Sequence, residues 1–229
     1  MENLDPGGVH TGDSIVVAPI LSLNNDELKM LNDSAIKLIK ELKIEGGCNV
    51  QFALDPVTGK YYLIEVNPRV SRSSALASKA SGYPIARVTA KIAVGMSLEE
   101  ISVAGCNAST EPRLEYIVSK FPRFAFDKFP GAQNTLGTQM KATGEVMGIG
   151  SSLEESILKS VRSLEIGICH IHMKKFDDYL DDDLFTYIKE FRDDNIYAIS
   201  ELLRRGFSTS KIHEITKITD VFINAIKNI

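Results

Sequence analysis

The feature that most constrains the fold is a strand–turn–strand pattern between residues 49 and 67. Residues 49–54 alternate polar and apolar side chains, and residues 61–66 form a second run of bulky and branched ones. Residues 55–59 between them, Asp-Pro-Val-Thr-Gly, have strong turn chemistry. Together these segments predict an antiparallel β-hairpin. Its second strand must end at Pro68, because proline lacks the N–H that a strand interior donates.

Polar side chains gather on one face of the second strand. Strict alternation places Leu63, Glu65 and Asn67 on that face, so that a carboxylate and an amide project side by side. Pairing across the hairpin brings Gln51 opposite Glu65 or within one residue of it. Oxygen atoms of this kind suit hard cations such as Mg²⁺, whereas a solvated sheet face explains each of these residues taken singly.

Two arginines follow this polar face directly. Arg69 and Arg72 place fixed positive charge beside the predicted cation site, a combination that suits a transferring phosphoryl group or a small oxyanion. His10 lies in a polar loop, and a lone loop histidine is by itself usually solvated or structural. His170 and His172 have no third ligand at a useful spacing, so the sequence does not favour a metal site there.

Composition narrows the class of protein. The chain has 229 residues, 44% of them hydrophobic and 24% charged, and a formal net charge of −4. These values are typical of a globular protein and give no general attraction to nucleic acid or to an anionic membrane. No apolar run approaches the roughly 18–20 residues of a spanning helix, and the three cysteines show neither a disulfide framework nor a zinc spacing. We expect a soluble cytoplasmic protein with reduced cysteines.

The chain divides into a mixed part and a helical part. Up to Gly167, strand patterns such as residues 145–150 interleave with helical patterns such as residues 26–42. Beyond Gly167 every periodic segment is helical. We therefore predict an α+β fold with an antiparallel sheet and helices in residues 1–167, followed by a small all-α bundle in residues 168–229. A bundle of about 60 residues has a marginal core by itself, so we expect it to dock on the first domain or on another chain.

Four runs of residues resemble the large chain of carbamoyl phosphate synthetase. They are Gly8 to Ser14, Asn49 to Ala53, Glu65 to Ala80, and Gly144 to Met147. The third run is the most specific, and its Val70 and Ser73-Ser74-Ala75-Leu76 favour the first, carboxyphosphate-forming ATP-grasp half of that chain. The resemblance implies that residues 1–167 form the C-terminal lobe of this ATP-grasp domain and that residues 168–229 begin the oligomerisation domain.

The resemblance also implies a reaction. ATP phosphorylates bicarbonate to carboxyphosphate, ammonia displaces phosphate to give carbamate, and a second ATP phosphorylates carbamate, in the service of pyrimidine and arginine biosynthesis. Carried over by position, Gln51, Glu65 and Asn67 would bind two Mg²⁺ or Mn²⁺ ions that bridge the phosphates of ATP. Arg69 and Arg72 would hold bicarbonate or the phosphoryl group. The residues expected to border the nucleotide are Gly8, Val9 and His10, with Gln51 and Glu65 reaching it through the metal.

The match is to part of that large chain only. The upstream lobe and the second ATP-grasp half have no counterpart in this sequence, so we expect the isolated chain to carry half a site and to be inactive. The implied partners are ATP, bicarbonate, ammonia, the rest of the large chain, a glutaminase small subunit and further copies of the chain. Two alternatives stay open: a non-catalytic assembly module that acts through the helical tail, and another ATP-grasp ligase such as a biotin carboxylase. The run from Val70 to Ala80 argues against the second.

Overall fold

The computed structural model describes residues 1–129 and 131–229. These residues form two compact units, one made of residues 1–22 and 115–229 and the other of residues 23–114. We call them the composite unit and the hairpin unit. Within the described residues, no helix is both long and apolar enough to cross a membrane.

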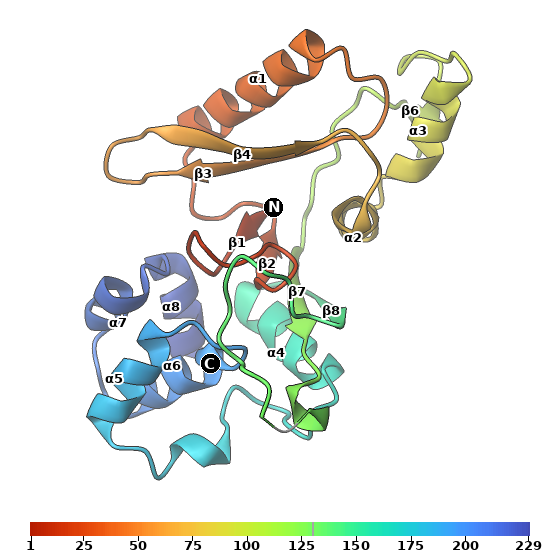
Figure 1. The fold of residues 1–229 in the computed structure, drawn as a ribbon. Coiled ribbons are helices and arrows are strands. Elements are labelled where there is room, and N and C mark those ends of the chain that lie inside the picture. Colours follow the sequence, from red (N-terminus) through yellow and green to blue (C-terminus); the bar gives the residue numbers. More distant parts are fainter. Residues whose placement is uncertain (130) are drawn as a thin grey trace. The chain divides into compact units, whose positions relative to one another are not determined.

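A four-stranded antiparallel sheet organises the composite unit, with the strand order β1-β2-β7-β8 (Figure 1). The strands are β1 (Glu2–Asn3), β2 (Val16–Ala18), β7 (Ile117–Arg123) and β8 (Gly144–Gly150). Strand β7 continues through Pro122, because β2 pairs only with Val118 to Lys120 and requires no N–H from Pro122. Pro122 instead lies opposite Glu145 of β8.

Helix α4 (Leu153–Ser163) packs on this sheet at close range. The contact uses small side chains: Ser119 of β7 shares a 2.8 Å hydrogen bond with Ser160 of α4. Gly148 of β8 lies so close to α4 that an added Cβ would be 2.7 Å from the backbone nitrogen of Ser160. A glycine in a strand commonly marks such a close approach, and this one lets the helix cover the sheet.

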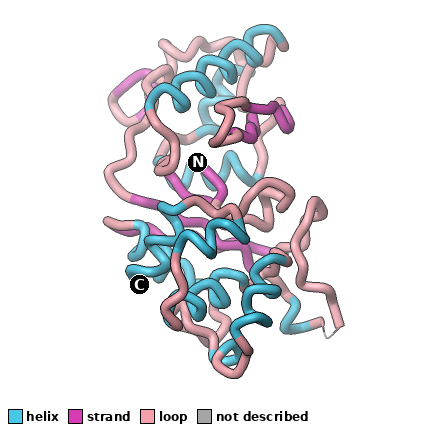
Figure 2. Tube along the Cα trace, turned by 90° about the vertical axis from the view of Figure 1, so that its left-hand side faces the viewer, coloured by secondary structure: helices cyan, strands magenta, loops and turns pink. Residues whose placement is uncertain are grey.

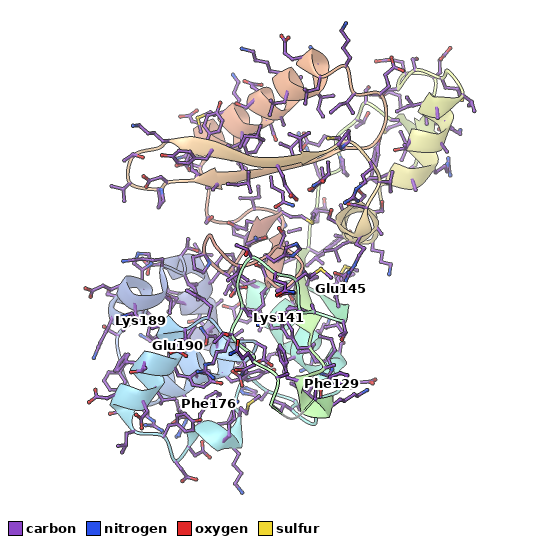
Figure 3. All side chains as sticks on the ribbon, in the orientation of Figure 1. Phe129, Lys141, Glu145, Phe176, Lys189 and Glu190 are labelled. Carbon is purple, nitrogen blue, oxygen red and sulfur yellow. The ribbon has the colours of Figure 1, made fainter. Side chains whose placement is uncertain are left out.

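The C-terminal tail is helical, as the periodicity predicts (Figure 2). Its helices are α5 (Asp181–Lys189), α6 (Asn195–Arg204), α7 (Thr209–Thr216) and α8 (Asp220–Asn228). Phe176, labelled in Figure 3, belongs to the short 3₁₀ helix η2 (Lys174–Phe176) and is fully buried. Its ring meets those of Tyr179 and Tyr187 edge to face.

One hydrophobic core joins the sheet, α4 and the tail. Val17 of β2, Ile157 of α4 and Phe222 of α8 all belong to it, with at most 1% of each residue exposed. The amphipathic tail helices are too short to form a large core alone, so they bury their apolar faces against the sheet and α4. The predicted domain boundary near Gly167 stays a prediction, and the compact units divide the chain elsewhere.

The hairpin unit contains the predicted β-hairpin and the helix expected over residues 26–42. Strands β3 (Asn49–Leu54) and β4 (Tyr61–Asn67) pair antiparallel, with Gln51 opposite Glu65. Helix α1 (Asn25–Glu41) starts at a capping box of Asn24 and Glu27. It lies along the hairpin (Figure 1), where the Ser34 and Tyr61 hydroxyls are 2.8 Å apart.

The remainder of the hairpin unit is a smaller helical layer. It contains α2 (Arg72–Ser81), α3 (Ile85–Ala93) and a two-stranded ribbon of β5 (Ser102–Val103) and β6 (Cys106–Asn107). Val88, Ile101, Val103 and Ala108 form a small hydrophobic cluster in this layer. Antiparallel sheets with helices, followed by a helical tail, confirm the predicted α+β class.

Candidate active-site elements

A β-bulge decides which side chains of β4 share a face. The register shifts between Gln51 and Phe52, so that Glu65 pairs with Gln51 whereas Leu63 pairs with Phe52. Neighbours on a strand point to opposite faces, and Leu63 therefore lies on the face opposite Glu65. The prediction that Leu63 shares the polar face was wrong, because strict alternation does not anticipate the extra residue at Ile64.

The bulge leaves a purely polar cluster on the face of Glu65. Glu65 Oε1 accepts hydrogen bonds from Gln51 Nε2 at 2.6 Å and from Asn67 Nδ2 at 2.9 Å. The same Gln51 amide donates to Asn49 Oδ1 at 3.2 Å. Glu65 is exposed and the other three residues are half-buried. We call Asn49, Gln51, Glu65 and Asn67 the oxygen cluster.

Asn49 was missed by the sequence prediction, although a signal was present. Residues 49 and 51 are two apart on β3, so their side chains share a face. Asn49 also pairs directly with Asn67 across the hairpin. The alternation of β3 thus contained the fourth member of the oxygen cluster.

The two predicted arginines lie immediately beyond the end of β4. Arg69 donates its backbone N–H to Asn67 O at 2.8 Å, which closes a tight turn after Pro68. Arg72 is the first residue of α2, whose N-cap is Ser71. Both arginine side chains are exposed. The strand end and the helix start therefore place two guanidinium groups within seven residues of Glu65 along the chain.

Gly8, Val9 and His10 belong to the composite unit and lie in the loop before β2. The ring of His10 is half-buried, and its Nδ1 accepts the N–H of Gly12 at 2.9 Å. A neutral His10 therefore carries its proton on Nε2. The His10 backbone N–H donates to Gly137 O at 2.8 Å. These contacts hold the imidazole in one orientation.

Two buried charges that the sequence prediction missed fix this loop. The ammonium of Lys120, a residue only 3% exposed, donates to the carbonyls of Thr11, Gly12 and Ser14 at 3.2, 3.1 and 2.6 Å. Asp13, 1% exposed, accepts the N–H groups of Lys141 and Ala142 at 2.8 Å each. No sequence signal pointed to Lys120, because a lysine in a strand is ordinarily solvated.

The structure also places His172 beside two carboxylates, which the sequence spacing did not reveal. His172 Nε2 lies 2.7 Å from Asp177 Oδ1, and this hydrogen bond is the largest cause that holds the pKa of Asp177 below its usual range. Glu201 completes a group whose possible ligand atoms lie within 4.8 Å of one another. However, Arg204 and Arg205 already bind the Glu201 carboxylate at 2.7 and 2.6 Å. An ion-pair network accounts for this group.

Two known domains match the chain, one after the other. Residues 1–101 match the family described as the carbamoyl-phosphate synthase L chain, ATP binding domain. Residues 145–229 match the carbamoyl-phosphate synthetase large chain, oligomerisation domain. The first match contains the oxygen cluster, both arginines and His10. The second contains α4 and the tail helices.

Solved structures share the fold at low sequence identity. A complete multifunctional pyruvate carboxylase from Rhizobium etli is 18% identical, with a TM-score of 0.51 over 66% of this chain and 18% of its own. A Rhizobium etli pyruvate carboxylase variant crystallised without acetyl coenzyme-A gives 17% identity and a TM-score of 0.50, over 65% of this chain and 18% of its own. A biotin carboxylase complex from Campylobacter jejuni is 14% identical, with a TM-score of 0.47 over 87% of this chain and 46% of its own.

This chain spans less than half the length of each of those three solved chains. The two structures from Rhizobium etli support the fold alone, since their identity to the chain is low. The family assignment rests on the two domain matches, which occur in one chain and come from the same large subunit. The protein therefore belongs to the carbamoyl-phosphate synthetase large-chain family, whose members are ATP-binding ligases of the ATP-grasp type.

Proposed function

We propose that the oxygen cluster holds two divalent cations, Mg²⁺ or Mn²⁺, against the phosphates of ATP during formation of carboxyphosphate from bicarbonate. The observation that carries the proposal is the convergence of two amide side chains on the single carboxylate of Glu65, at 2.6 and 2.9 Å. Carboxylate and amide oxygens are the ligands that hard cations take.

The donor set fits a cation after a small change. Gln51 and Asn67 now direct amide nitrogens at Glu65, whereas a metal requires amide oxygens. Rotation of each terminal amide exchanges the two atoms and leaves the backbone hydrogen bonds of the hairpin intact. When bound, such cations neutralise charge on the transferring phosphoryl group.

The arginines and the His10 loop would complete the binding of substrates. Arg69 and Arg72 offer planar, permanently charged guanidinium groups that suit the oxyanions bicarbonate and phosphate. Gly8, Val9 and His10 would border the nucleotide, in an orientation that Lys120 and Asp13 fix. Catalysis of phosphoryl transfer is largely positioning and charge stabilisation, and these residues supply both.

The overall reaction that we propose is that of a glutamine-dependent carbamoyl phosphate synthetase, which uses two ATP, bicarbonate and ammonia for pyrimidine and arginine biosynthesis. The domain matches support this choice over a biotin carboxylase. The glutaminase small subunit and the cytoplasmic location remain part of the proposal.

Manganese binding tests the oxygen cluster directly. Mn²⁺ is titrated into the protein with and without ATP and followed by electron paramagnetic resonance. We expect Glu65→Gln to weaken Mn²⁺ binding at least about 10-fold, since even supporting residues of metal sites commonly contribute that much. The matched control is Glu45→Gln, an exposed glutamate of the same unit. Equal affinity in wild-type protein and Glu65→Gln would reject the metal assignment.

Self-association is the second part of the proposed function, because residues 145–229 match an oligomerisation domain. Light scattering on Leu180→Asp tests it: Leu180 is 71% exposed at the start of α5, outside the core. We expect this charge to reduce the mass of an oligomer. If the variant forms the same oligomer, Leu180 does not lie in the contact between copies. A monomeric wild-type protein would argue against self-association of this chain.

A further inference from the structure

The composite unit contains a cavity of about 180 Å³ that the proposed function does not use. Its wall comes from the start of the chain, from β7 and from the beginning of α6. The volume is similar to that of an engineered apolar cavity of about 150 Å³ that binds benzene. The cavity is therefore large enough for a small organic molecule.

Part of the cavity wall is apolar. Ile15, Phe121 and Leu164 line it, and each of them is at most 9% exposed. Ile196 and Ile199 of α6 extend the same surface. These apolar side chains suit a hydrocarbon body, whose transfer out of water is favourable.

Two residues of the wall have buried polar atoms that lack a partner among the described residues. The Tyr197 hydroxyl forms no hydrogen bond with any described residue, although only 3% of Tyr197 is exposed. Arg192 Nε is likewise buried and unpaired within the described chain. Buried polar atoms are nearly always hydrogen-bonded, and each exception requires an explanation. A ligand that donates a hydrogen bond in the cavity accounts for the Tyr197 hydroxyl, whereas Arg192 Nε is itself a donor and is not satisfied by such a ligand.

The charges that line the cavity are not balanced. Each cation has a carboxylate partner: Arg123 pairs with Asp127, Lys175 with Asp194, and Arg192 with Glu190. Asp5 and Asp193 have no ion-pair partner within 4.0 Å among the described residues. Asp5 accepts the N–H of Ile15 at 2.8 Å, and Asp193 accepts the amide of Asn134 at 2.9 Å. The remaining carboxylate of the wall, Asp13, is already bound by backbone N–H groups.

Burial has the expected effect on both carboxyls. It raises the pKa of Asp5 to about 6, against a weaker opposing influence of Lys120. It also raises the pKa of Asp193 to about 6, with a further contribution from the charge of Asp194. A nearby cation favours the charged form of a carboxyl, so a bound cation would relieve both.

We propose that this cavity binds a small organic cation: a primary ammonium attached to an apolar body about the size of benzene. The ammonium has three N–H donors, and Asp5, Asp193 and the Tyr197 hydroxyl offer acceptors. An anion is disfavoured because every cation in the wall already has a carboxylate partner. The proposal uses no residue of the oxygen cluster, so it does not depend on the proposed ATP site.

Three probes of similar shape and different charge test this site in the whole 229-residue chain. They are benzylamine, benzyl alcohol and benzoate, titrated at pH 7.5 by calorimetry and located by chemical-shift changes in amide NMR spectra. We expect benzylamine to shift the amides of residues 192–199 and to bind at least 10-fold more tightly than benzyl alcohol. We expect no binding of benzoate. No binding of benzylamine, or equal binding of the alcohol, would overturn the proposal.

Variants then assign the acceptors. We expect Asp193→Asn and Asp5→Asn each to weaken benzylamine binding several-fold, and Tyr197→Phe to weaken it less. The control is Asp178→Asn, an exposed aspartate of the same unit outside the cavity wall. Wild-type benzylamine affinity should also fall as the pH drops below about 6, where Asp5 and Asp193 gain protons. Full affinity in both Asp5→Asn and Asp193→Asn, or no change with pH, would contradict the site.

Discussion

Lys120→Met tests the role of a buried charge in the loop before β2. The substitution keeps the length and apolar stem of the side chain and removes an ammonium that donates to three carbonyls at 3.2, 3.1 and 2.6 Å. A hydrogen bond with a charged partner contributes about 1.5–3 kcal/mol, so three of them amount to roughly 5–9 kcal/mol. Burial of an ammonium costs several kcal/mol, and the variant does not carry this cost, which offsets part of the loss. We expect a net loss of about 3–5 kcal/mol, because three carbonyls lose their donor and each unsatisfied buried acceptor costs about 1–3 kcal/mol.

Native-state hydrogen exchange measures this loss where it should occur. Peptides that cover β7 and β8 report the free energy of opening of the composite unit, and peptides that cover the hairpin unit serve as an internal reference. The matched control is Lys159→Met, whose ammonium pairs with Glu155 at 2.8 Å but whose side chain is 45% exposed. Such a pair contributes at most about 1 kcal/mol. A loss below about 1 kcal/mol in Lys120→Met would refute our account of the loop.

Two further predictions concern packing and pH. Gly148→Ala should lower the unfolding free energy by at least about 2 kcal/mol, because the added Cβ would lie 2.7 Å from Ser160 N. The control Gly137→Ala should be nearly neutral, since no atom of the described residues outside its chain neighbours would lie within 4 Å of its added Cβ. Equal urea midpoints for the two variants would contradict the close packing of α4. Asp193 binds its proton more tightly when folded, since its pKa rises from 3.8 to about 6. Its contribution to stability is therefore present below pH 4 and lost as the pH rises to about 6. Asp193→Asn should flatten the fall in stability over this range, and an unchanged pH profile in urea unfolding would show that Asp193 is not perturbed.

Local chemistry made the hairpin predictable. The turn residues 55–59, the alternation of β3 and the proline at position 68 all act between near neighbours in sequence, and the pairing of Gln51 with Glu65 follows from them. The helices of the tail were predictable for the same reason, because their apolar side chains recur at the helical period. These features specify one structure without reference to the rest of the chain.

The bulge, the close sheet–helix packing and the cavity could not be predicted in this way. Ile64 is the extra residue of β4 that has no partner in β3, and an isoleucine at this position gives no indication of a bulge. The contact of Gly148 with α4 becomes visible only once the helix lies on the sheet. In the sequence, Lys120 looks like a solvated strand lysine. In the fold, its ammonium is bound by three carbonyls of a loop that precedes it by more than 100 residues in the chain.

By itself, the sequence determined the local elements, the oxygen-bearing residues around Glu65 and the resemblance to one ligase family. The tertiary structure decided which of those residues share a face, which charges are buried, and which carboxylates lack a cation. The physical reason is range: turn and helix preferences are set by adjacent residues, whereas burial and charge pairing depend on segments that meet only after folding. Asp5 and Asp193 are 188 residues apart in the sequence, and only the fold places both in the wall of one cavity.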